Sequence, residues 1–173
     1  MNSVFKKYIF IVASTLFLCG SILIAYQTSF HPLTAPSGSQ VTNASEIISP
    51  PPSVEIDGTT IAVELATTSA AVAKGLSGRA SLEQDRGMLF IFSRPDRYRF
   101  WMPNMHFPID IIWLDDDNRV VDIDENVPHE FDPAHPVFFM PDSPARYVLE
   151  LNAGFAKTRG ITIDDTAIFH HIE

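Results

Sequence analysis

The sequence predicts a small, mainly β domain, an antiparallel β-sandwich or barrel with one or two short helices, preceded by a single transmembrane helix. Three features support this. An uncharged apolar run occupies residues 8–26, a stretch rich in Ser, Thr, Pro and Gly follows it, and short apolar runs separated by Pro, Gly and Asp fill the remainder. Many short strands with turn signals between them are typical of sandwiches and barrels. The chain therefore divides into a membrane anchor (1–26), a flexible linker (27–53) and a β domain (54–173).

The apolar run has the properties of an uncleaved signal anchor. As a helix its 19 residues would span about 30 Å, the thickness of a hydrocarbon core. Lys6 and Lys7 precede it and the next basic residue is Lys74, so the positive-inside rule places the N-terminus in the cytoplasm and the β domain outside. We expect a single-pass protein of the cell membrane. A cleaved signal peptide is the alternative, although the run is longer than usual and no small-x-small site follows it.

Composition excludes several classes of function. A formal net charge of −9 disfavours binding to nucleic acid, because phosphates would be repelled. The single cysteine, Cys19, lies in the apolar run, so the β domain has neither a disulfide nor a thiol nucleophile. Gly-x-Ser-x-Gly and Gly-x-x-x-x-Gly-Lys patterns are absent from the sequence, and no cofactor is predicted.

The first half of the domain is predicted to begin with a hairpin. Residues 54–56 and the alternating apolar residues 61–65 flank Asp57-Gly58, which suits a tight turn. Ser69 is expected to cap a short helix over residues 70–74 that ends at Gly75, and residues 81–84 have the pattern of a second capping box. Strands are predicted over residues 88–92 and 98–102, with a turn at 94–96 and a loop at 103–108.

The second half contains three further predicted strands and a closing hairpin. The strands are residues 109–114, 120–123 and 147–151, with a turn at 115–118 and a long loop rich in Pro and His over residues 127–145. A helical turn is expected at 154–159, and residues 161–169 are predicted to form a hairpin around Asp164-Asp165.

Five linked motifs then identify a family resemblance. They are Gly75-Leu76-x-x-Arg79, Gly87-Met88-Leu89-Phe90-x-Phe92, Phe100-Trp101-Met102-x-Asn104, Pro108-x-Asp110 and Tyr147-x-Leu149-Glu150-x-x-x-Gly154. In this order and spacing, over residues 60–169, the chain resembles the uncharacterised bacterial and archaeal family known as domain of unknown function number 192. The resemblance implies a mainly β, sandwich-like fold, often behind a signal peptide or anchor, and supplies no function.

The chain departs from that family pattern in the loop near Trp101. Relatives commonly have Met at the position of Ser77, Lys at Pro103 and Thr at Met105. The exchange of Lys and Thr removes polar groups, which weakens the case for a polar ligand in this loop.

Four residues are the predicted ligand-binding set: Arg79, Trp101, Asn104 and Asp110. Asp110 opens the apolar run 109–114, and a carboxylate among apolar neighbours needs partners or becomes protonated. An ion pair with an arginine, the capping of loop amides, and a role as ligand contact or general base are all open readings of Asp110. Trp101 and Asn104 lie where a strand meets a loop and could form the rim of a small-ligand site, or could pack in the core and stabilise a turn.

Histidines in the long loop are of metal-ligand type but do not form a recognised motif. His129, Asp132 and His135 lack the spacing of a zinc site, and solvated loop side chains are the simpler reading. No metal site is predicted.

Three functions remain open from the sequence. The first is a membrane-anchored module that binds a small molecule or peptide outside the cytoplasm, and the second is a structural or interaction protein of the envelope. The third is a hydrolase that uses Asp110 with a histidine or a metal. The first is the prediction, and a non-enzymatic role is favoured.

Overall fold

The computed structural model describes residues 49–172, which belong to one compact unit. The predicted anchor and most of the predicted linker lie outside the described residues. Among the residues that are described, no helix is long and apolar enough to cross a membrane.

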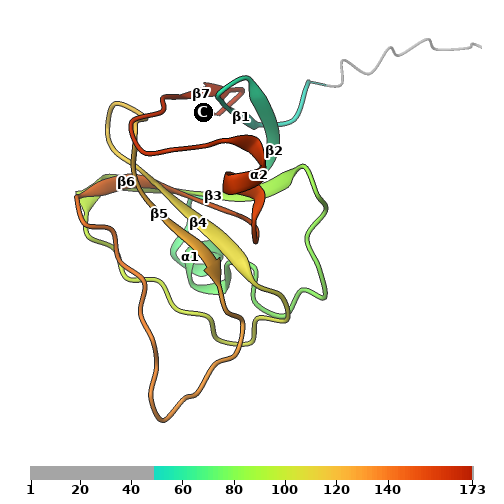
Figure 1. Ribbon diagram of the computed structural model, residues 1–173, viewed down its shortest axis with the longest axis vertical. Coiled ribbons are helices and arrows are strands. Elements are labelled where there is room, and N and C mark those ends of the chain that lie inside the picture. The colour runs from blue at the N-terminus through green and yellow to red at the C-terminus, as the bar shows by residue number, and fades with distance from the viewer. Residues whose placement is uncertain (1–48, 173) are drawn as a thin grey trace, which may run out of the picture. The chain divides into compact units, whose positions relative to one another are not determined.

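Seven strands and two short helices make up the domain (Figure 1). Their bounds are β1 Ser53–Ile56, β2 Thr59–Ala66, α1 Ser69–Lys74, β3 Arg86–Asp96, β4 Ile109–Leu114, β5 Val120–Val127, β6 Ala145–Asn152, α2 Phe155–Arg159 and β7 Ala167–His170. The strands form a single sheet in the order β5-β4-β6-β3-β2-β1-β7. The prediction of a mainly β domain with one or two short helices is confirmed.

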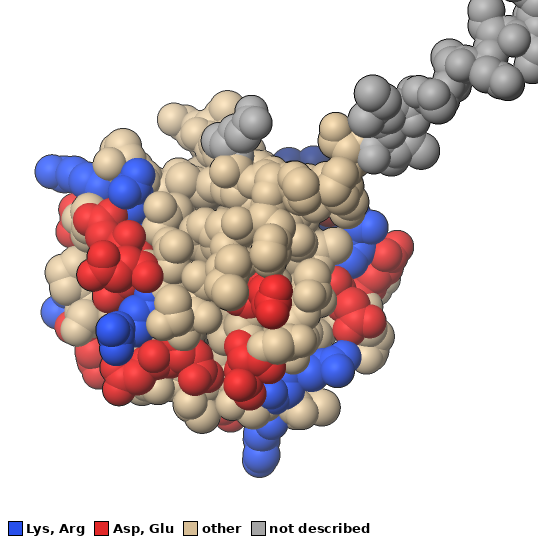
Figure 2. Space-filling view, turned by 90° about the horizontal axis from the view of Figure 1, so that it is seen from above, with Lys and Arg blue, Asp and Glu red and all other residues tan. Residues whose placement is uncertain are grey.

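The sheet curls into a half-barrel whose two edges meet at one point. Backbone bonds join the segment before β7 to the start of β5: Val120 N donates to Asp165 O at 2.8 Å, and Ala167 N donates to Asn118 O at 2.8 Å. Figure 1 shows β7 and β1 at one end of the domain and the long loop between β5 and β6 at the other. Seen from the β7 and β1 end, uncharged residues cover much of the upper and central surface, an acidic side chain lies near the middle, and other acidic and basic side chains gather toward the sides and bottom of the view (Figure 2).

Both faces of the sheet are buried, each in its own apolar cluster. Alternation along β4 sends Ile112 and Leu114 to the inner cluster, which α2 covers, and Ile111 and Trp113 to the outer cluster. Helix α1 and the loops before β4 and after β5 cover the outer cluster. This division explains why all six residues of β4 are buried.

One strand pair corrects the predicted antiparallel architecture. β2 and β3 are parallel, whereas the other pairs are antiparallel. The connection between them is long and contains α1, and a parallel pair requires such a crossover. The hairpin of β1 and β2 around Asp57-Gly58 is confirmed.

The helix predictions were only partly right. Thr68, not Ser69, caps α1, because its Oγ1 accepts the amide of Ala71 at 3.2 Å. Residues 81–84 form no helix. The carbonyls of Leu82 and Glu83 instead accept the side-chain amide of Asn152 from β6, at 3.1 and 3.0 Å. Helix α2 was predicted within one residue of its start.

Three strand predictions were wrong. β3 continues through the predicted turn at 94–96, after an irregularity, and Asp96 pairs with Ala145. Residues 98–102 form no strand and make one isolated bridge, Phe100 to Phe139. Residues 161–169 form no hairpin; β7 pairs instead with the neighbouring strand β1, which is distant in sequence.

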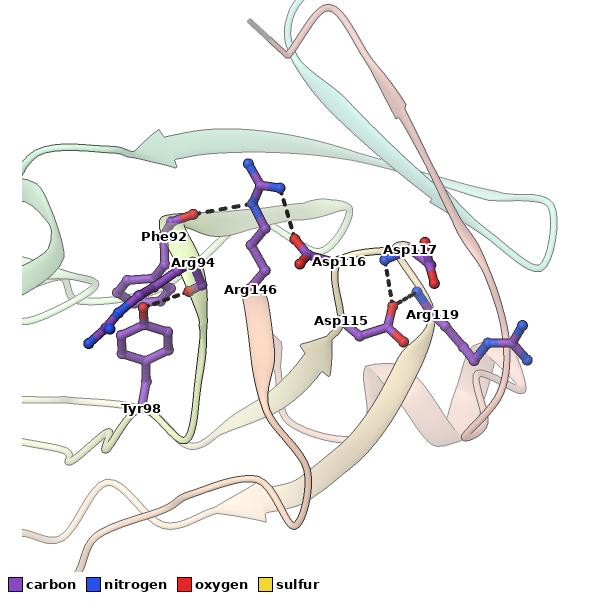
Figure 3. A network of polar contacts seen from close by, with 8 residues as sticks. All are labelled: Phe92, Arg94, Tyr98, Asp115, Asp116, Asp117, Arg119 and Arg146. Atoms are coloured by element: carbon purple, nitrogen blue, oxygen red, sulfur yellow. Dashed lines mark hydrogen bonds and ion pairs between the residues drawn. The ribbon is translucent and has the colours of Figure 1, made fainter.

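The acidic turn between β4 and β5 is held by a polar network (Figure 3). Asp115 Oδ1 accepts the amides of Asp117 and Arg119, each at 2.9 Å. Arg146 of β6 donates to Asp116 Oδ1 at 2.8 Å and to the carbonyl of Phe92 at 3.3 Å. The turn thus connects to two other strands at this end of the sheet.

Candidate functional site

Asp110 lies on the opposite face of the sheet from the pocket beside Trp101, so the four predicted site residues do not surround one place. Asp110 lies opposite Leu151 of β6 and shares the inner face, whereas Trp101 lies over the outer face. Arg79 forms a two-bond ion pair with Glu64, at 2.6 and 2.7 Å, and not with Asp110. The hypothesis that the four residues surround one ligand is therefore wrong in its geometry.

Asp110 is a buried acceptor for backbone amides. It is fully buried, and its Oδ1 accepts the amides of Asn126 at 2.8 Å and Gly154 at 3.0 Å. Its Oδ2 accepts the amide of Ala156, in the first turn of α2, at 3.0 Å. The reading of Asp110 as a carboxylate that caps loop amides is confirmed, and the alternative reading as the partner of an arginine is wrong.

Asn104 holds two loops together. Its carbonyl accepts the amide of Gly78 at 2.8 Å, and the hydroxyl of Ser77 donates to the carbonyl of Pro103 at 2.8 Å. Asn104 has a φ of 54°, a left-handed conformation that asparagine tolerates better than most residues. These contacts fasten the loop after α1 to the loop that carries Trp101.

A pocket of about 190 Å³ opens beside Trp101 on the outer face of the sheet. Its lining residues differ widely in burial, which indicates their depth. Trp101 is 49% exposed, whereas Phe90 is 1% exposed and Glu150 is 6% exposed. Phe100, Met102, Lys74 and Arg99 also line it. The pocket thus combines apolar and aromatic side chains with polar ones, including a carboxyl group at depth and two basic residues.

Glu150 was not among the predicted site residues. It lies on β6, opposite Met88 of β3 and Ile111 of β4, at a position where the strand pattern calls for an apolar residue. Its Oε2 is buried without a hydrogen-bond partner in the described part of the chain. Burial raises the pKa of Glu150 to about 8, and the charge of Arg79 acts in the opposite direction. The carboxyl group is therefore mainly protonated at neutral pH.

Two other carboxylates lie in the same row across the sheet, and both have partners. The strand registers align Asp124, Ile111, Glu150, Met88 and Glu64 on one line. Glu64 pairs with Arg79, and Asp124 accepts Nε1 of Trp113 at 2.9 Å. Glu150 is exceptional within this row, since buried polar groups normally have partners.

In the sequence, Glu150 has the same features that drew attention to Asp110. Each is a single carboxylate inside an apolar strand, and each belongs to one of the five motifs. Only the pairing of β6 between β3 and β4, together with the fold of the 97–107 loop, shows that one faces backbone amides and the other faces a pocket.

Aromatic residues of the long loop pack against Trp101 at the edge of the pocket. Trp101 stacks on Phe138 with ring centroids 5.9 Å apart, and meets Phe131 edge to face at 5.5 Å. The guanidinium of Arg99 lies 4.0 Å from the centre of the Phe138 ring. A smaller hollow of about 120 Å³ adjoins, and Met102 lines both.

The loop histidines form local pairs. His135 Nδ1 lies 2.9 Å from Asp132 Oδ2, a contact that lowers the pKa of Asp132, and His129 Nδ1 lies 3.8 Å from Glu130. Within residues 49–172, no group of three or more His, Cys, Asp or Glu side chains is arranged to hold a metal ion.

The fold and the pocket together define a small half-barrel domain with an aromatic pocket above a buried carboxyl group. The chain belongs to the DUF192 family, described as "Uncharacterized ACR", whose model matches residues 53–169. This confirms the family resemblance of the five motifs. No curated protein matches the chain significantly.

Two solved structures share the fold with substantial sequence identity. A protein of unknown function from Novosphingobium aromaticivorans DSM 12444 is 37% identical, with a TM-score of 0.60; the match covers 67% of this chain and 83% of that one. A candidate transcription regulator from Sinorhizobium meliloti 1021 is 32% identical, with a TM-score of 0.61, and covers 70% of this chain and 96% of its own.

Proposed function

We propose that the chain is a membrane-anchored binding module that holds a small molecule, or one group of a peptide, in the pocket beside Trp101. One observation carries the proposal: Glu150 lines the pocket, and its buried Oε2 has no hydrogen-bond partner among the described residues. An unsatisfied buried carboxyl group costs about 1–3 kcal/mol or more. A ligand that supplies the missing partner would recover that free energy on binding.

The pocket resembles small-molecule sites in composition and is small in volume. Aromatic and apolar side chains with few polar groups are typical of such sites. Its volume of about 190 Å³ exceeds the ~150 Å³ cavity that takes benzene, which suits a ligand the size of a substituted ring or a single peptide side chain.

The pocket supports a binding module over a structural protein without a pocket. The hydrolase alternative relied on Asp110, whose two oxygens already accept three backbone amides and face away from the pocket. The acidic net charge argues against a role in DNA binding for this chain, whatever the role of the Sinorhizobium protein.

Native mass spectrometry of the full chain, purified in mild detergent from the cells that express it, tests the binding function. We expect a bound small molecule that Trp101→Ala removes and Ile168→Ala retains. Ile168 is a matched control, because it is an apolar residue of similar exposure, 54%, on β7 outside the pocket. Wild type without any bound mass, in preparations from several growth conditions, would contradict the proposal.

The membrane anchor requires its own test. The uncharged run 8–26 and the preceding Lys6-Lys7 motivate the proposed orientation. A reporter that is active only outside the cytoplasm, fused after Glu173, should be active. Activity of a cytoplasm-specific reporter at that position would refute the proposed orientation.

A further inference from the structure

We propose that the pocket beside Trp101 takes a small organic acid. Its anionic head lies near Lys74 and Arg99, its apolar body packs on the aromatic side chains, and an oxygen at its far end accepts a hydrogen bond from the Glu150 carboxyl group. This inference rests on the proposed binding function and specifies the class of ligand.

The distribution of basic residues is the first argument. The chain has 21 acidic and 12 basic residues, so most arginines of the domain find a carboxylate; those in ion pairs are Arg79, Arg86, Arg94, Arg119, Arg146 and Arg159. Four described cations form no ion pair: Arg97 and Lys157 lie outside the pocket lining, whereas Lys74 and Arg99 belong to it. Two unpaired cations beside one pocket of an acidic domain favour an anionic ligand.

The position of Arg99 is the second argument. Its guanidinium lies over the ring of Phe138, which stacks on Trp101, so an aromatic stack holds the cation at the outer part of the pocket. A guanidinium has five N–H donors in one plane, and two of them can bind a carboxylate together. Stacking on Phe138 occupies the face of the guanidinium of Arg99 and leaves the N–H groups at its edge free to donate.

The state of Glu150 is the third argument. The charge that acts on the Glu150 carboxyl group is that of Arg79, which is itself paired with Glu64. Lys74 and Arg99 line the same pocket, and Asp124 lies two strands away. β3 and β4 face it with the apolar Met88, Phe90 and Ile111. In this setting burial dominates and raises the pKa to about 8, so at neutral pH the group is an O–H donor that does not repel an anion.

A dependence on pH follows from this arrangement. Below about pH 8 the protonated Glu150 donates to the ligand oxygen, and above it the carboxylate faces an acceptor and repels the anionic head. Binding of an organic acid should therefore weaken as the pH rises through this range. A cationic ligand would show the opposite trend, because it prefers ionised Glu150.

Calorimetric titration of the full chain in detergent with three matched probes tests the inference. The probes are para-acetylbenzoate, para-isopropylbenzoate, which lacks the far oxygen, and para-acetylbenzylamine, which carries a cationic head. Near pH 6 we expect the acetyl acid to bind about tenfold or more tightly than either of the others, because one lacks the oxygen to which the Glu150 carboxyl group would donate and the other carries a head of the wrong charge for Lys74 and Arg99.

Two variants assign the effect to the proposed residues. Arg99→Gln should weaken the acetyl acid about tenfold without a similar change for the amine, whereas the exposed and distant Arg94→Gln should not. Wild type should lose about tenfold in affinity for the acid between about pH 6 and about pH 9, and Glu150→Gln, which cannot ionise, should lose much less.

The outcomes separate the inference from the proposed function. Tighter binding of the amine, or affinity for the acid that rises with pH, would overturn the organic-acid inference and leave the binding function standing. Failure of all three probes to bind would overturn the inference as well, while the mass measurement decides the binding function independently.

Discussion

Asp110 binds three backbone amides, from the end of β5 and the start of α2, through a single buried carboxylate, and its replacement should be costly. Its oxygens accept the amides of Asn126, Gly154 and Ala156 at 2.8, 3.0 and 3.0 Å, and its side chain is fully buried. In Asp110→Asn, the remaining oxygen can keep the two bonds of Oδ1. The new amide then faces the amide of Ala156, donor against donor. The variant loses one hydrogen bond to a charged group and leaves two donors unsatisfied, the amide of Ala156 and the new side-chain amide. The free energy of unfolding should therefore fall by about 2–4 kcal/mol.

Asp110→Ala should be more severe, because all three amides lose their acceptor. We expect a loss of about 4–6 kcal/mol, which is comparable to the whole stability of a small domain. Urea unfolding followed by circular dichroism measures both variants, with the midpoint shifted and the slope unchanged. Asp117→Asn, an exposed carboxylate in the turn of Figure 3, is the matched control and should stay within about 0.5 kcal/mol of wild type. A similarly small effect of Asp110→Asn would refute the reasoning.

Three further predictions concern stability. The pKa of Glu150 is raised from 4.5 to about 8, so between these values the folded state binds more protons than the unfolded state, and the free energy of unfolding should fall as the pH rises from about 4.5 to about 8. Glu150→Gln should flatten this decline and stabilise the domain near pH 8 by about 2–4 kcal/mol. An unchanged pH profile of the variant in urea titrations would contradict this prediction. Arg79→Gln removes the charge that lowers this pKa, so the decline should extend to higher pH, while loss of the exposed pair itself costs only about 0–1 kcal/mol. Gly87→Ala would place a Cβ 2.7 Å from Leu151 Cδ2 and 2.9 Å from the backbone oxygen of Glu150. The free energy of unfolding should therefore fall by about 1–3 kcal/mol, which thermal unfolding would show as a lower melting temperature. The exposed Ser93→Ala should leave the melting temperature unchanged.

The pocket explains why two kinds of buried carboxylate coexist in one small domain. Asp110 stabilises the fold, because backbone amides satisfy it completely. Glu150 has no such partner and lowers stability near neutral pH, as its raised pKa indicates. Binding and catalytic sites frequently contain a group that lowers the stability of the free protein and lines a pocket.

Local patterns predicted those elements whose formation depends on neighbouring residues. The Asp57-Gly58 hairpin, the strand 109–114, the turn 115–118 and the short helix that ends at Gly75 all follow from turn chemistry or apolar runs, and all are present. The capping box at 81–84 had an equally good local pattern. It failed because Asn152, distant in sequence, occupies the carbonyls of Leu82 and Glu83.

The residue pattern alone predicts a mainly β domain of this family with an acidic net charge, and it predicts that Asp110 needs partners among apolar neighbours. The partners themselves depend on how distant segments pack. The pairing of β6 between β3 and β4 places Glu150 on the outer face, and the following helix α2 brings its amides to Asp110 on the inner face. Alternation along a strand says that two residues face opposite sides, but not what covers each side, because covering segments come from distant parts of the chain.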